Sequence, residues 1–132
     1  MTLRAILTAG LLAVVVTSPR AAPDPARGEQ VYARCLACHA LAYDRVGPRH
    51  CGLFGRRAGS VVGFAYSPAM KRSRIVWDEA TLDKFLSSPT QALPGTAMTY
   101  DGVPEAQDRR DLIAYLRAAN GSAACAGPSR RQ

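Results

Sequence analysis

The segment Cys35-Leu36-Ala37-Cys38-His39 decides what this chain folds around. Two cysteines that are separated by two residues and followed at once by a histidine have the spacing of a haem attachment site, in which the thiols reach two vinyl groups and the imidazole reaches the iron. At the end of a helix, the two cysteines lie one turn apart on the same side. The same cysteines could instead form a redox-active pair or half of a zinc site, whose remaining ligands would be His50, Cys51 or Cys125.

The first 22 residues have the three parts of a secretory signal peptide. Residues 1–4 are short and basic, residues 5–16 are apolar or small, and residues 17–22 are small and polar, which predicts cleavage near Ala22. The apolar run of about 12 residues is shorter than the ~20 that cross a bilayer, so a retained N-terminal anchor is the weaker alternative. Export to the periplasm also favours haem attachment, because cysteines are handled oxidatively there.

The rest of the sequence predicts an all-α protein. Cap residues followed by proline, and apolar positions three and four apart, define helices over residues 26–34, 68–73, 79–87 and 105–119. Between Ala40 and Gly63, glycine and proline are too frequent for regular elements, and no strand alternation is long enough to build a sheet. Short helices joined by such loops would make a poor core alone, which indicates that a cofactor fills the middle.

Size and charge narrow the function classes. A chain of 132 residues fits a single domain, which we expect at residues 23–121, followed by a C-terminal tail at 122–132. Lys and Arg number 17 against 10 Asp and Glu, for a net charge of +7. This charge suits an acidic protein partner or an anionic membrane surface. The chain lacks the Lys/Arg stripe with interleaved aromatic residues that nucleic-acid readers show, so nucleic-acid binding is not expected.

Further segments, read together with the cysteine motif, carry a resemblance to a known family. They are Gly47-Pro48, Gly52-Leu53-Phe54-Gly55-Arg56-Arg57-Ala58-Gly59, Gly63-Phe64-Ala65-Tyr66-Ser67, Trp77, Pro94-Gly95-Thr96-Ala97-Met98 and Arg110-Asp111-Leu112-Ile113-Ala114-Tyr115-Leu116. The chain resembles the class I c-type cytochromes, close to the mitochondrial cytochrome c and bacterial periplasmic cytochrome c group. The resemblance implies a monomer with a compact fold of four to five short helices and long loops, wrapped around one haem c that is bound covalently through Cys35 and Cys38.

The same resemblance implies the iron ligands. Met98 matches the family's second axial ligand, opposite His39. A thioether ligand favours reduced iron and raises its potential, and a six-coordinate site leaves no open position for a substrate. The resemblance therefore implies an electron-transfer protein and not an enzyme. The carbonyl of Pro48 is expected to accept the other ring proton of His39.

Three more residues match positions that bind the haem propionates. Tyr66 and Trp77 match side chains whose hydroxyl and indole N–H bind an inner propionate, and Arg56 lies nearby to offset its charge. The chain departs from its relatives at the docking face. Ala97 stands where relatives carry a lysine beside the ligand methionine, and most of the positive charge is arginine, so the family's docking face is not carried over.

Two cysteines and one histidine remain after these assignments. The family fold brings the end of the last helix near the loop after Pro48, so we expect a disulfide between Cys51 and Cys125, with two free thiols as the open alternative. His50 is expected to be an exposed loop residue without a task, and the alternative is a ligand of the iron in a misfolded or high-pH form.

Four functions are consistent with these residues. The expected one is a soluble periplasmic carrier of single electrons that makes transient contact with membrane complexes, such as a quinol:cytochrome c oxidoreductase and a terminal oxidase or reaction centre. The second is a dedicated redox partner of one periplasmic dehydrogenase or reductase. The third is a peroxidase or ligand-binding haem protein, which requires Met98 to be absent from the iron. The fourth is the zinc module, and the fold alone selects no partner.

Overall fold

A computed structural model describes residues 21–127 of the chain. Most of the expected signal peptide and the last five residues of the expected tail lie outside the described residues. Within residues 21–127 there are six α-helices, one 3-10 helix, and no strand beyond an isolated bridge between Arg57 and Val76. The all-α prediction is therefore confirmed. No helix in this part of the chain is long and apolar enough to cross a membrane.

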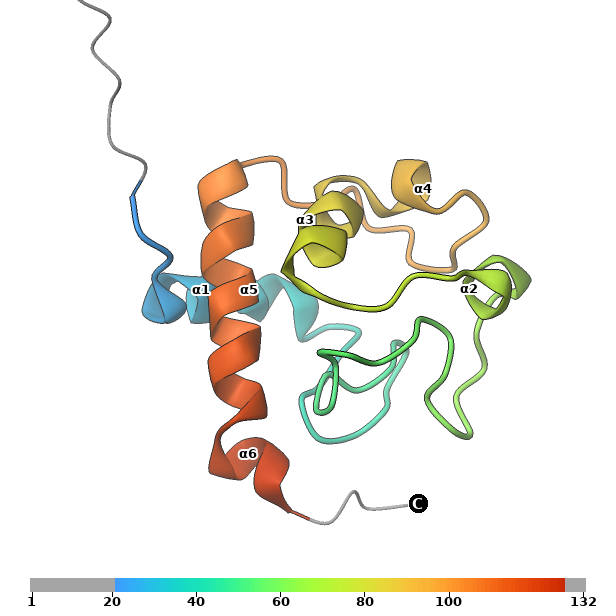
Figure 1. Cartoon of the computed structure of the whole chain (residues 1–132), viewed down its shortest axis with the longest axis horizontal. Coiled ribbons are helices and arrows are strands. Elements are labelled where there is room, and N and C mark those ends of the chain that lie inside the picture. Colours follow the sequence, from blue (N-terminus) through green and yellow to red (C-terminus); the bar gives the residue numbers. More distant parts are fainter. Residues whose placement is uncertain (1–20, 128–132) are drawn as a thin grey trace, which may run out of the picture.

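The first helix, α1 (Pro25–Tyr32), crosses the long helix α5 (Ala106–Asn120), as Figure 1 shows. Asp24 caps α1 because its carboxylate accepts hydrogen bonds from the first free N–H groups of the helix. Gly28 permits the close crossing, since a Cβ at this position would lie 1.9 Å from the carbonyl oxygen of Asp111. The N-terminal helix, which leads into the cysteine motif, is thereby packed on the C-terminal helix.

Three shorter helices follow the glycine-rich loop, namely α2 (Pro68–Arg72), α3 (Glu79–Ser87) and α4 (Pro89–Ala92). A capping box starts α3, in which the carboxylate of Asp78 accepts from the N–H of Thr81 at 2.7 Å and the Thr81 hydroxyl accepts from the N–H of Asp78 at 2.8 Å. The bounds of α3 agree with the sequence prediction. The single turn α4 lies where the sequence predicts only a loop.

The last helix, α6 (Ala123–Ala126), is cross-linked to the glycine-rich loop. Cys125 forms a disulfide with Cys51, and their Cα atoms lie 5.3 Å apart. The expected pairing of these cysteines is confirmed. With α4 and α6, each a single turn, the described residues contain six α-helices rather than the expected four to five.

Asn120, the last residue of α5, holds the same loop through its side chain. Its Oδ1 accepts hydrogen bonds from the N–H groups of Gly52 at 2.6 Å and Leu53 at 3.3 Å. Its Nδ2 donates to the carbonyls of His50 at 3.1 Å and Leu116 at 2.8 Å. The C-terminal end of α5 therefore fixes the part of the loop that follows Pro48.

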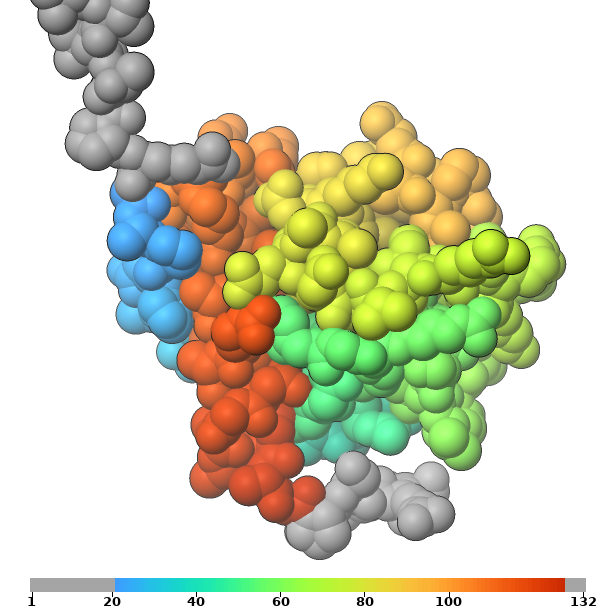
Figure 2. Space-filling model, viewed as in Figure 1, coloured from blue at the N-terminus to red at the C-terminus, as the bar shows by residue number. Residues whose placement is uncertain are grey.

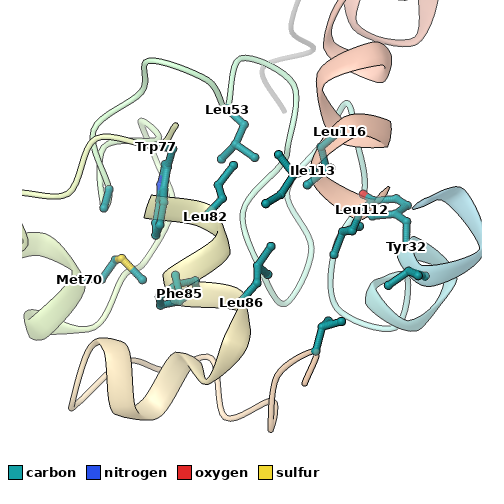
Figure 3. Packing of buried hydrophobic residues seen from close by; sticks show 13 residues of the cluster. Tyr32, Leu53, Met70, Trp77, Leu82, Phe85, Leu86, Leu112, Ile113 and Leu116 are labelled. Carbon is teal, nitrogen blue, oxygen red and sulfur yellow. The ribbon is translucent and has the colours of Figure 1, made fainter. Parts of the chain in front are cut away.

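The hydrophobic core runs between α3 and α5 and extends toward the loops. Figure 3 shows the α3 side chains directed between those of α5 and those of Trp77 and Met70. In the space-filling view, the loop (green) and α3 (yellow) pack against α5 along one side of the molecule (Figure 2). The labelled core residues are Tyr32, Leu53, Met70, Trp77, Leu82, Phe85, Leu86, Leu112, Ile113 and Leu116.

Candidate functional site

The cysteine motif lies directly after α1. A 3-10 turn, Ala33–Cys35, continues the helix, and the N–H groups of Cys38 and His39 donate to the carbonyl of Cys35 at 3.1 and 2.8 Å. These two hydrogen bonds place Cys38 and His39 one turn after Cys35. Both thiols are free, Cys35 half-buried and Cys38 exposed. Burial raises the pKa of Cys35, so this residue stays a neutral thiol.

His39 is buried, and one hydrogen bond determines which of its ring nitrogens carries the proton. Its Nδ1 lies 2.8 Å from the carbonyl oxygen of Pro48, and a carbonyl can only accept, so Nδ1 carries the proton and Nε2 keeps its lone pair. Burial lowers the pKa of His39 and so keeps the ring neutral, although the hydrogen bond to Pro48 acts in the opposite direction. Gly47 packs against this ring, since a Cβ there would lie 2.2 Å from Cε1 of His39. The expected contact with Pro48 is confirmed.

A cavity of about 430 Å³ opens in front of the His39 ring. Core side chains such as Leu82, Phe85 and Leu112 line it, so its wall is largely apolar. All seven residues that the sequence singled out also line it, although they come from separate segments, namely the turn after α1, the glycine-rich loop, the segments just before α2 and α3, and the loop after α4. These seven are Cys35, Cys38, His39, Arg56, Tyr66, Trp77 and Met98.

Met98 reaches the cavity from the loop that follows α4. The hydroxyl of Thr96 accepts a hydrogen bond from the N–H of Met98 at 3.2 Å, and the N–H of Thr96 donates to the carbonyl of Leu93 at 3.0 Å. These bonds order the loop locally. A second methionine, Met70 of α2, also lines the cavity. Sequence reasoning did not find Met70, because only the folded chain brings α2 to this wall.

Arg56, Tyr66 and Trp77 form the polar part of the wall. The guanidinium of Arg56 donates to the carbonyls of Cys51 at 3.0 Å and Arg49 at 2.8 Å, and burial lowers its pKa. The hydroxyl of Tyr66 accepts from the N–H of Val61 at 3.4 Å. Trp77 is buried and is paired through its main chain with Arg56, whose carbonyl accepts its N–H at 3.0 Å. A partly buried cation and two aromatic donors thus border one cavity.

His50 does not have the surface position that the sequence predicts. It is partly buried and its ring stacks on that of His39, with centroids 4.3 Å apart and an interplanar angle of 21°. Burial, with the neighbouring His39 and Arg56 as lesser causes, lowers the pKa of His50 to about 3. The prediction was wrong because the side chain's burial depends on α1 and α5, which close over this loop from distant parts of the sequence.

The zinc alternative loses its ligands in this structure. Cys51 and Cys125 are joined to each other and cannot serve as thiolates. Among residues 21–127, no group of three or more His, Cys, Asp or Glu side chains is placed to hold a metal ion. By contrast, two free thiols at the end of a helix, a neutral imidazole with a free nitrogen and a thioether, all bordering an apolar cavity, have the donor chemistry that a haem requires.

Comparisons with known proteins agree with this donor set. The chain matches the cytochrome c family over residues 25–120. It is 45% identical to a cytochrome c2 of Rhodomicrobium vannielii over 119 residues, 88% of this chain and 95% of the relative. It is also 45% identical to a cytochrome c2 of Blastochloris viridis over 106 residues, 78% of this chain and 84% of the relative.

A solved structure supports the same conclusion for the fold. Cytochrome cH from Methylobacterium extorquens is similar with a TM-score of 0.70 and 40% sequence identity, covering 72% of this chain and 98% of that one. The all-α architecture described above is thus a cytochrome c fold. The chain belongs to the cytochrome c family, whose members hold a haem c through a cysteine pair and are electron-transfer proteins rather than enzymes.

Proposed function

We propose that this protein is a monohaem electron carrier in which His39 and Met98 are the two axial ligands of a haem c attached through Cys35 and Cys38. The observation that carries the proposal is the hydrogen bond between His39 Nδ1 and the Pro48 carbonyl, 2.8 Å long. It leaves Nε2 as the basic nitrogen, next to the cavity that Met98 also borders. When bound, haem supplies a one-electron iron couple, whose potential a methionine ligand raises.

The remaining polar residues of the wall have roles that follow from their chemistry. Tyr66 and Trp77 can donate hydrogen bonds to a propionate, and the partly buried Arg56 guanidinium compensates its negative charge. Pro48 strengthens His39 as a donor by accepting its second ring proton. These residues hold the group in place and keep water from it, which limits the reorganisation that accompanies each electron transfer.

We further propose that the protein is exported to the periplasm and acts as a monomer. The apolar stretch over residues 5–16 and the presence of a structural disulfide support export. The partners would be a quinol:cytochrome c oxidoreductase and a terminal oxidase or reaction centre. A dedicated dehydrogenase or reductase is the alternative, and reduction and oxidation rates measured with each purified complex distinguish the two.

The axial assignment is tested by absorption spectra and a pair of methionine variants. The purified holoprotein should show a sharp reduced α band and, when oxidised, the weak long-wavelength band of iron–methionine coordination. Met98→Ala should keep the haem attached, lose the weak band and take up small ligands such as cyanide or imidazole. Met70→Leu, the matched control on the same cavity wall, should retain the band. An unchanged spectrum and no ligand uptake in Met98→Ala would contradict the assignment and favour Met70 or another ligand.

A further inference from the structure

His50 is held against His39 by the main chain on both of its sides. Its N–H donates to the carbonyl of Leu41 at 3.1 Å, and its own carbonyl accepts from the Asn120 amide at 3.1 Å. The stacked ring, 4.3 Å from that of His39, is therefore placed by backbone anchors. A side chain so fixed is suited to restrain its neighbour.

The ring of His50 is held in turn by a buried tyrosine of α1. Tyr32 Oη lies 3.1 Å from His50 Nδ1, and the two rings meet edge to face with centroids 5.6 Å apart. Burial raises the pKa of Tyr32, so its hydroxyl stays protonated and available for this bond. Tyr32, His50 and His39 thus form a row of three rings that runs from α1 to the site.

The ring of His39 needs a restraint of this kind. Its hydrogen bond to Pro48 fixes the position of one atom, Nδ1, but a single bond leaves the ring free to swing about that contact. A flat face packed parallel to the ring, 21° from it, opposes the swing. The close approach of Gly47 to the same ring narrows the remaining space.

We propose that His50 is a positioning residue, which sets the rotation of the His39 imidazole about its bond to the haem iron, while Tyr32 holds His50 in place. The proposal rests on the assignment of His39 as an iron ligand. The rotation of an axial imidazole determines which iron d orbitals it overlaps, and hence how the unpaired spin of the oxidised protein spreads over the four pyrrole rings. Partners that orient a ligating histidine also tune the metal's potential.

Two substitutions at His50 separate stacking from simple filling of space. His50→Phe keeps an aromatic face against His39, whereas His50→Leu keeps apolar bulk without the face. In the oxidised holoprotein, NMR shifts of the four haem methyl groups report the imidazole rotation. We expect His50→Phe to keep the order of these shifts and His50→Leu to change it. His50→Leu should also change the redox equilibrium constant at least about threefold, or ~28 mV for one electron.

The hydroxyl bond is tested by a matched pair of tyrosine variants. Tyr32→Phe should shift the haem methyl resonances in the same direction as His50→Leu, by a smaller amount. Tyr43→Phe, at a site that is 58% exposed, should leave them unchanged. If His50→Leu does not accumulate as holoprotein, Tyr32→Phe carries the test alone.

The proposal is overturned if His50→Leu and His50→Phe both leave the methyl shifts unchanged, or if both change them alike. It is also overturned if the only available variant, Tyr32→Phe, gives the wild-type pattern. A wild-type protein that lacks the histidine-ligated haem spectrum would instead refute the proposed function, so the two failures are distinguishable.

Discussion

The disulfide between Cys51 and Cys125 should contribute most of its stabilisation through the unfolded state. The bond joins residues separated by 74 positions. In the chain-entropy model, closing a loop of this length removes enough freedom from the unfolded chain to be worth about 4.5 kcal/mol at 25 °C, and removal of native disulfides costs about 2–5 kcal/mol. Attachment of haem to Cys35 and Cys38 does not close this loop. We therefore expect the double variant Cys51→Ser/Cys125→Ser to lose about 3–4 kcal/mol of unfolding free energy.

Guanidinium chloride unfolding of the holoprotein, followed by far-ultraviolet circular dichroism, measures this loss. The double variant should also show a larger denaturant slope, because its unfolded chain exposes more surface. The hydrogen bonds of Asn120 still hold the loop to α5, so the native spectrum should be unchanged. Wild-type protein in dithiothreitol is the control and should lose the same amount, since thioethers resist this reductant. A loss under about 1 kcal/mol, with an unchanged slope, would refute the unfolded-state account.

Two further substitutions test the contacts that join the ends of the fold. Gly28→Ala should lower the unfolding free energy by about 1–3 kcal/mol, because the new methyl would lie 1.9 Å from the Asp111 carbonyl. The control Gly121→Ala should leave the unfolding free energy unchanged, because its Cβ would meet nothing closer than 3.6 Å. Equal melting temperatures of the two variants in calorimetry would contradict the reasoning. Asn120→Ala should lower the unfolding free energy by about 1–3 kcal/mol, because the Gly52 N–H loses the acceptor that lies 2.6 Å away. Hydrogen exchange at this N–H should become faster. Asn120→Asp keeps that acceptor and should slow the exchange again; if both variants exchange alike, the bond is not responsible.

Local signals were sufficient for the longer helices and for the attachment motif. The range of α3 follows from Asp78 at its start and Pro89 just beyond its end, both of which act within one turn. The CXXCH spacing needs no tertiary context either, because its geometry lies within a single turn. The range of α5 was predicted to within one residue at each end from its apolar face and Gly121.

Contacts between distant segments account for what the sequence could not supply. The single turns α4 and α6 contain no periodic apolar pattern, and α6 is stabilised by a bond to Cys51, far away in the chain. The loop pattern around His50 is that of an exposed residue, and its burial arises only when α1 and α5 pack over it. Met70 likewise reaches the cavity wall only after α2 docks. The long-range pairing of Cys51 with Cys125 was anticipated, but from the family resemblance rather than from a local pattern.

The cross-link between Cys51 and Cys125 places a constraint on the order in which the protein matures. Of the single disulfides that these four cysteines can form, only the one between Cys51 and Cys125 leaves both attachment thiols free. In an unfolded chain, joining Cys38 to nearby Cys51 costs about 1.5 kcal/mol less loop entropy than joining Cys51 to Cys125. Early oxidation would therefore favour a mispaired, dead-end precursor. Once attachment has consumed Cys35 and Cys38, this competition is gone, and Cys51 and Cys125 are left to pair only with each other.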